Sequence, residues 1–132
     1  MDVTKKIGKN AGKIWVALEK DGPQNQSSLI KKTKLPLNDF YAGVGWLARE
    51  NKITKNRTLY TLGETNLTNQ IGENAGKIWK LLESNGEVDV SSITKMAQIK
   101  TQDAYSALGW LARENKIIPN KLKTNKLIFK LK

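Results

Sequence analysis

The chain has 132 residues, of which 39% are hydrophobic and 27% are charged, a balance typical of globular proteins. The sequence has neither histidine nor cysteine, which removes the commonest general base, the commonest metal ligand and all thiolate chemistry. The formal net charge of +11 favours a polyanionic partner, so we expect a binding protein without cofactor or metal rather than an enzyme.

Membrane insertion and secretion are not expected. No apolar run reaches the ~18 residues that a membrane span needs. The first residues also lack the apolar stretch that follows the charges of a signal peptide. We therefore expect a cytoplasmic protein that does not bind membranes.

The first predicted element is a helix over residues 7–18. Its apolar residues recur at spacings of four, three and four, which places them on one helical face: Ile7, Ala11, Ile14 and Leu18. Gly22 follows at a position where glycine commonly ends a helix. Trp15 lies beside this face, where packing in a core or an interface is the expected role.

The sequence of this helix returns 64 residues later. Residues 7–15 and 71–79 differ at one position, residues 45–53 and 109–117 are identical, and 25 of the 47 positions between residues 7 and 53 match without a gap. The chain is therefore an internal duplication. We expect unit one over residues 1–63, a polar linker over 64–70 and unit two over 71–132, with the units able to pair as an intramolecular pseudo-dimer.

A short extended segment and a short helix come next in each unit. The extended segment is clear over residues 87–90 and weaker over residues 23–26. Asn25 and Asp89 are good N-caps for the helices that follow. These second helices are expected over residues 27–33 and 91–97.

The third helix is the longest and is expected over about residues 38–51 and 102–115. One face of this helix is expected to be buried and the opposite face to be exposed. Gly45 and Gly109 lie inside this helix, where glycine costs about 1 kcal/mol relative to alanine, so we expect another backbone, or the ring of Trp46 or Trp110, to approach closely there. The face predicted to be buried carries Phe40, Val44, Leu47, Ala104, Leu108 and Leu111.

Each unit ends in a predicted β-hairpin, within residues 52–62 and residues 117–131. Short runs of Ile, Leu, Tyr and Phe between polar turns are typical of strands. Two helices joined by a tight turn, the second one longer and followed by a hairpin, make a winged helix-turn-helix. The predicted fold class is therefore mainly α with small β-hairpins, as two winged helix-turn-helix domains in tandem.

Two motifs carry a family resemblance. Asn-Ala-Gly-Lys-Ile-Trp in the first helix and Tyr-x-x-Leu-Gly-Trp-Leu-Ala-Arg-Glu-Asn-Lys-Ile at residues 105–117 resemble small bacterial winged helix-turn-helix domains of unassigned function. The resemblance covers nearly the whole chain twice and implies the fold. It also implies a DNA-binding role, by the fold alone. Unit one departs from the motif at Gly43, where unit two has Ala107.

The hairpins, or wings, are the predicted contacts to phosphate. Residues 52–62 contain three basic residues and no acid, and residues 116–132 contain six basic residues and no acid. In winged helix proteins the wing contacts phosphate or the minor groove. The candidate phosphate-binding residues are Lys52, Lys55, Arg57, Lys116, Lys121, Lys123 and Lys126.

The third helix is the predicted reader of the major groove. Asn and Gln side chains can bind adenine, and Tyr can hold phosphate, but no Arg or Lys is among its exposed residues, so we expect low sequence specificity. Arg49 and Arg113, at its far end, each precede a glutamate, which fits either a local ion pair or a DNA contact. The candidate groove-contacting residues are Asn38, Tyr41, Gln102, Tyr105 and Ser106.

Two functions are consistent with this sequence. The first is a regulator-like protein that binds double-stranded DNA, with the duplication acting as a built-in dimer; the sequence leaves RNA open. The alternative is a protein–protein interaction module on the same fold, without a nucleic-acid role. That module would use an exposed aromatic patch formed by Trp15, Trp46, Trp79 or Trp110.

Overall fold

A computed structural model describes residues 2–132. In unit one, a long helix is followed by a short strand, two further helices and a hairpin, in the predicted order. The elements are α1 (Val3–Asp21), β1 (Gln24–Asn25), α2 (Gln26–Thr33), α3 (Leu37–Arg49), β2 (Ile53–Asn56) and β3 (Leu59–Leu62).

Unit two repeats this order. Its first helix begins at Thr68, so the last three residues of the expected linker, 68–70, are helical. The elements are α4 (Thr68–Asn85), β4 (Val88–Asp89), α5 (Val90–Ala97), α6 (Thr101–Arg113), β5 (Ile117–Lys121) and β6 (Leu127–Leu131). The predicted fold class is confirmed. No helix within residues 2–132 is both long and apolar enough to cross a membrane.

Local sequence explains where the helices begin and end. Asn25 and Asp89 cap α2 and α5 as predicted, because each side-chain oxygen accepts a hydrogen bond of 2.8 Å from the backbone N–H three residues on. Gly22 and Gly86 follow α1 and α4 with φ of 75° and 74°, a left-handed conformation that favours glycine. The ends of the first helices and the beginnings of the second helices are therefore set by residues that sequence reasoning identified.

Each wing is a three-stranded antiparallel sheet. The strand orders are β1-β3-β2 and β4-β6-β5, so the short extended segment pairs with the last strand of its own hairpin. Gln24 pairs with Tyr60, and Val88 pairs with Phe129. Tyr60 and Phe129 are almost completely buried, and the third strand thus ties the wing to the helical core.

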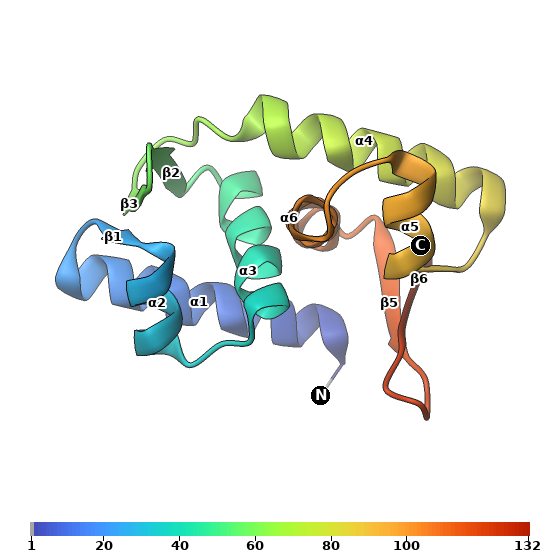
Figure 1. The fold of residues 1–132 in the computed structure, drawn as a ribbon, viewed down its shortest axis with the longest axis horizontal. Coiled ribbons are helices and arrows are strands. Elements are labelled where there is room, and N and C mark those ends of the chain that lie inside the picture. The colour runs from blue at the N-terminus through green and yellow to red at the C-terminus, as the bar shows by residue number, and fades with distance from the viewer. Residues whose placement is uncertain (1) are drawn as a thin grey trace.

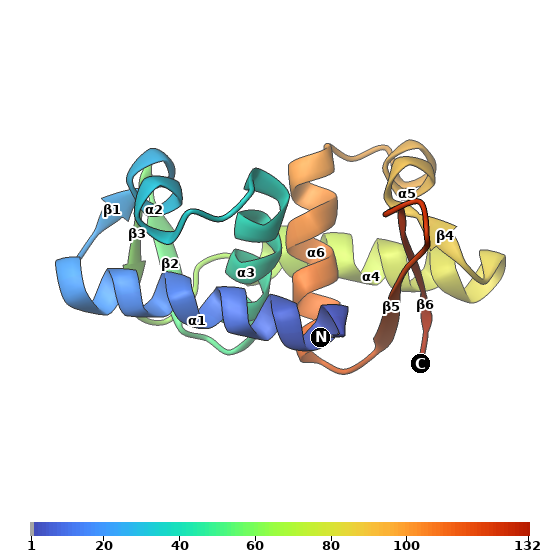
Figure 2. The same ribbon diagram turned by 90° about the horizontal axis from the view of Figure 1, so that it is seen from below.

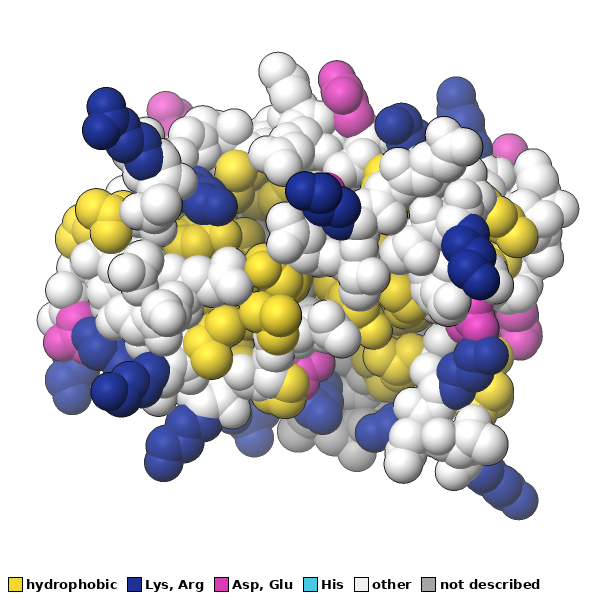
Figure 3. Space-filling model, viewed as in Figure 1, with side chains coloured by type: hydrophobic (Ala, Val, Ile, Leu, Met, Phe, Trp, Pro, Cys, Tyr) yellow, Lys and Arg dark blue, Asp and Glu magenta, His cyan; other side chains and the backbone are white. Residues whose placement is uncertain are grey.

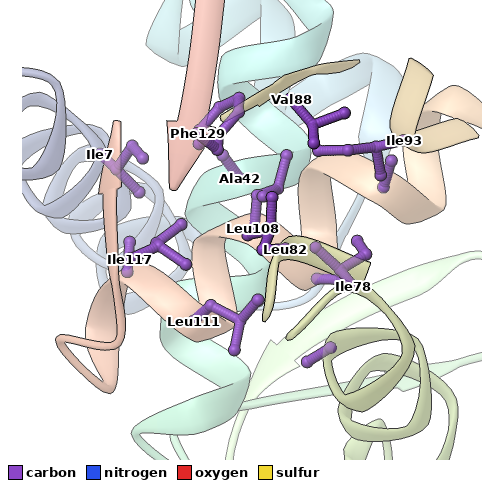
Figure 4. Close-up of a cluster of buried hydrophobic side chains, with 14 residues drawn as sticks. Ile7, Ala42, Ile78, Leu82, Val88, Ile93, Leu108, Leu111, Ile117 and Phe129 are labelled. Carbon is purple, nitrogen blue, oxygen red and sulfur yellow. The ribbon is translucent and has the colours of Figure 1, made fainter. Parts of the chain in front are cut away.

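The predicted core is confirmed and divides into two clusters, one per unit. All the residues predicted to be buried in the first and third helices are buried. Each cluster also takes in a residue of the other unit: Ile7 joins the core of unit two, and Ile71 joins the core of unit one. Figure 4 shows Ile7 and Ala42 beside the core residues of unit two.

The two units meet at their third helices. Helices α3 and α6 lie side by side at the centre of the molecule, with one wing toward each end (Figures 1 and 2). The N-terminal part of α1 reaches α6 and β5 of unit two, and α4 in turn contacts α3. The duplicated units are therefore packed as an intramolecular pair.

Candidate nucleic-acid interface

Helices α3 and α6 touch backbone to backbone where they cross. A Cβ atom on Gly45 would overlap the carbonyl oxygen of Ser106, and one on Gly109 would overlap the carbonyl oxygen of Ala42. The expected close approach of a backbone is confirmed, but the expected role of the Trp46 ring is wrong. That ring lies over Gly8 in α1 instead, and Trp110 lies correspondingly over Gly72 in α4.

Two reciprocal ion pairs flank this crossing. Arg49 Nε lies 3.0 Å from Glu114 Oε2, and Arg113 Nε lies 3.0 Å from Glu50 Oε2. Each guanidinium carbon also lies 5.8 Å from the centroid of a tryptophan ring of the other unit. The acidic partner of each arginine is thus a glutamate of the opposite unit and not the glutamate that follows the arginine in sequence. Both arginines are half exposed, so these ion pairs add little to the free energy of folding. Their main effect is on the orientation in which the two units pair.

This packing covers part of the face that the third helix was expected to expose. Ala42 is 5% exposed and Ser106 is 9% exposed, so the expectation of a fully free outward face is wrong for both. The helices are too close to each other at this point for either to present these residues to a DNA groove. Asn38 and Gln102, in the first turns of α3 and α6, remain exposed.

The two tyrosines of this face lie between the units and are half-buried. The Tyr41 hydroxyl lies 3.1 Å from Oε1 of Gln26 and 3.3 Å from Oε1 of Gln102. Burial raises the pKa of Tyr105, and the negative charge of Asp39 in the other unit raises that pKa further. The Tyr105 hydroxyl is therefore neutral at physiological pH, and the Tyr41 hydroxyl contacts Gln102 of the other unit.

The predicted basic residues of the wings divide into paired and unpaired groups. Lys52 and Lys116 lie 3.7 Å and 3.6 Å from Glu50 and Glu114, and Lys126 Nζ forms a close pair with Asp89 Oδ2 at 2.6 Å. Hydrogen bonds from the Lys126 side chain and the Ser92 backbone hold the Asp89 pKa well below its usual range. Within residues 2–132, no ion pair is recorded for Lys55, Arg57, Lys121 or Lys123.

Two of the unpaired cations, Arg57 and Lys123, are in the turns at the tips of the wings, whereas Lys55 and Lys121 are in strands β2 and β5. Arg57 is in the tight turn of wing one with φ of 58°, and Lys123 is in the longer turn of wing two. Lys55 Nζ lies 5.1 Å from the centroid of the Tyr60 ring. Figure 3 shows dark blue basic side chains protruding from the tip of the β5–β6 hairpin.

Two clefts lie where a wing faces the first turns of helices from the other unit. One, of about 120 Å³, brings together four of the predicted residues and adds two that sequence reasoning missed, Gln26 and Tyr60. Burial raises the pKa of Tyr60 to about 12, so its hydroxyl is a neutral group in this cleft. The four predicted residues in the cleft are Tyr41, Lys55, Gln102 and Ser106.

The second cleft is the counterpart of the first, because Ile7, Asp39 and Pro119 in it are equivalent to Ile71, Asp103 and Lys55 at the offset of 64 residues. It has a volume of about 460 Å³ and lies between wing two and the N-terminal parts of α1 and α3. Of the predicted residues it contains Lys121 only. Its other polar or charged lining residues include Lys6, Asn10, Asp39 and Asn120, and Val3, Ile7, Pro119 and Leu127 also line it. No single-unit motif identifies these residues, because each cleft is completed by the other unit.

Three helices and a β-sheet wing in each half place this protein in the class of winged helix-turn-helix proteins. The chain belongs to the family described as winged helix-turn-helix domain (DUF2582), which matches residues 1–62 and again residues 67–131.

A relative and a solved structure show what else this chain is similar to. It is 44% identical over 69 residues to the uncharacterized protein MJ1608 of Methanocaldococcus jannaschii, a match that covers 48% of this chain and 91% of that protein. The mRNA-binding domain of elongation factor SelB from E. coli, solved in complex with SECIS RNA, is 18% identical with a TM-score of 0.38, over 94% of this chain and 98% of that one. A TM-score at this level does not establish a shared fold.

Proposed function

We propose that this protein binds double-stranded DNA with low sequence specificity, in a regulator-like and non-catalytic role. The observation that carries the proposal is the set of cations on the wings for which no acidic partner is recorded: Lys55, Arg57, Lys121 and Lys123. Phosphate contacts supply affinity and position but no sequence information. A net charge of +11 adds long-range attraction for any polyanion.

In this proposal, the wings carry the binding and the third helices hold the units together. Specific readers insert the outward face of the third helix into the major groove. Here that face is partly covered where α3 crosses α6, which leaves Asn38 and Gln102 as its exposed polar residues. The paired residues Lys52, Lys116 and Lys126 contribute less than the unpaired ones, because a phosphate must compete with a carboxylate for each.

Fluorescence anisotropy with a labelled random-sequence duplex at several salt concentrations tests the proposal. If four phosphates are neutralised, log affinity falls against log salt with a slope of about −4. Replacement of all four unpaired wing cations with alanine is expected to flatten this slope and to weaken binding to every sequence alike. A variant with Lys77, Lys80, Lys95 and Lys100 replaced by alanine loses the same net charge elsewhere and is expected to retain most of the slope.

Two results would contradict the proposal. Equal losses in the wing variant and the control variant would mean that net charge, and not the wings, carries the binding. No binding to duplex at low salt with micromolar protein would reject DNA. In that case, tight binding to an RNA hairpin, measured in the same assay, would assign the wings to RNA.

A further inference from the structure

Unit one carries an open groove between α1 and α2 that the proposed function does not use. Its volume is about 720 Å³, and Gly12, Val16 and Ala17 form its floor. Val16, in the middle of α1, is 55% exposed. Nothing lies within 4 Å of where a Cβ of Gly12 would be, so the floor is open to an approaching chain.

The rim of this groove is basic. Lys9, Lys13 and Lys20 come from α1, and Lys32 comes from α2. Lys32 lies 3.2 Å from Asp21, the acidic residue of the groove, and both are half exposed. No ion pair is recorded within residues 2–132 for the other three lysines. We call these residues and the apolar floor the basic groove.

Unit two shows that the fold does not require this groove. At the equivalent positions, 64 residues along, Lys80 replaces the exposed Val16 and Leu81 replaces Ala17. The rim loses most of its charge there, since Glu73, Ser84 and Met96 stand in place of Lys9, Lys20 and Lys32. Unit two folds in the same way without them. The combination of an exposed apolar floor and a basic rim is therefore specific to unit one and needs an explanation outside folding.

We infer that the basic groove binds an acidic amphipathic segment of a partner protein. Carboxylates of such a segment would pair with the lysines of the rim, while its apolar side chains would cover Val16 and Ala17. An apolar floor offers nothing to a phosphate backbone, which argues against nucleic acid as the occupant. A second copy of this chain is a poor occupant too, because each copy carries a net charge of +11.

A titration followed by nuclear magnetic resonance tests this inference independently of DNA binding. The probe is a synthetic 16-residue helix with glutamate on one face and leucine on the other, and the control probe is a scrambled peptide of the same composition. We expect saturable shifts confined to residues 9–20 and 32–33, with the scrambled peptide binding at least about tenfold more weakly.

A pair of reciprocal variants separates apolar contact from simple charge attraction. Val16→Lys adds a positive charge but removes the apolar floor, and we expect it to weaken peptide binding by about tenfold. The mirror variant, Lys80→Val, changes the equivalent surface of unit two and is expected to leave the affinity and the mapped site unchanged. Both side chains are exposed, and each variant places a residue that the other unit already carries there.

The inference is wrong if Val16→Lys binds the peptide as well as the parent protein does, or if the scrambled peptide binds equally. Shifts that map to the wings, or no saturable shift at millimolar peptide and low salt, would overturn it as well. Displacement of the peptide from the groove by a DNA duplex would assign the groove to nucleic acid. The duplex affinity of Val16→Lys is expected to match that of the parent, so failure here is distinguishable from failure of the wing proposal.

Discussion

Glycines at three places in the helices have different surroundings, so a side chain added there would have different effects. Gly45 and Gly109 stand where two backbones touch, and a side chain there meets a carbonyl group that cannot move aside. Gly12 stands in open space, so its cost to the helix is not offset by any contact within the described residues. At Gly43, where unit two has alanine, a Cβ would come within 2.7 Å of Ile14 Cδ1, so the Ile14 side chain would have to shift to admit alanine.

Alanine substitutions at these glycines should therefore differ in sign. Gly12→Ala is expected to raise the free energy of unfolding by about 0.5–1 kcal/mol, since alanine is the better helix former. Gly45→Ala is expected to lower it by at least about 1–3 kcal/mol, because overlap with Ser106 forces the helices apart. Urea titration at neutral pH measures both, and stabilisation by Gly45→Ala would mean that α3 and α6 are not in contact.

The buried face of the third helix gives a second test. Leu111 is 2% exposed in the core of unit two, and Leu111→Ala is expected to lower the free energy of unfolding by about 2–5 kcal/mol. Leu122, in the turn of wing two, is 40% exposed, and Leu122→Ala is expected to change it by less than about 0.5 kcal/mol. Similar effects of the two substitutions in denaturant titration would contradict this assignment of the core.

Residue patterns predicted burial well within a unit and poorly between units. The spacing of Val44 and Leu47 reports the core of their own unit, and both are buried as predicted. Ala42 is small and Ser106 is small and polar, so both are compatible with a solvent-facing side, yet they pack against the opposite unit. Helical periodicity cannot distinguish a face that meets water from one that meets a second copy of itself.

The helix caps differ between the units in one chemically useful way. Asn25 caps α2 with an amide, whereas Asp89 caps α5 with a carboxylate that is also paired with Lys126. Because the pKa of Asp89 is lowered on folding, its ionised form stabilises the native state at neutral pH. That stabilisation is present above the unfolded carboxyl pKa of about 4 and is lost as the pH falls below it.

The variant Asp89→Asn should isolate this effect. Asparagine preserves the cap, as Asn25 does in unit one, but removes the charge and the pair with Lys126. We expect the parent to be more stable than Asp89→Asn at pH 7 and the difference to shrink between about pH 4 and pH 2. Urea titrations at several pH values measure it, and parallel stability curves would show that Asp89 has the same pKa in both states.

Element order was predictable from sequence, whereas the role of one element was not. Alternating strand residues and turn residues predicted the hairpins and the short extended segments at residues 23–26 and 87–90, but the sequence did not show that each two-residue strand there pairs with the hairpin of its own unit. The third helix was expected in a DNA groove because single winged helix domains use it there. Its glycine pointed to a close neighbour, but sequence could not show that this neighbour is its own counterpart.

The two units should unfold together. Each core contains an isoleucine from the other unit, and the third helices are in direct backbone contact. We therefore expect one calorimetric transition with equal calorimetric and van't Hoff enthalpies. Gly45→Ala, which disturbs only the crossing, is expected to broaden or split this transition, whereas the exposed Val16→Lys should leave it single. Two separate transitions in the parent protein would show that the units are independent.

Duplication was evident from sequence, but the packing of the copies was not. A constant offset of 64 residues shows that two segments resemble each other and says nothing of how they meet. The composite clefts follow from the packing, since each joins a wing to helices of the opposite half. Residues such as Lys6 and Asn10 could be assigned to a site only once both halves were in place.

Joining the halves in one chain gives the molecule a direction. Two separate identical units paired in this way would look the same after a half-turn and would lie on a duplex equally well either way round. Here one wing turns tightly at residues 57–58 and the other through a longer loop at residues 122–126, so the two ends are inequivalent. A covalently joined pair of this kind therefore has a head and a tail.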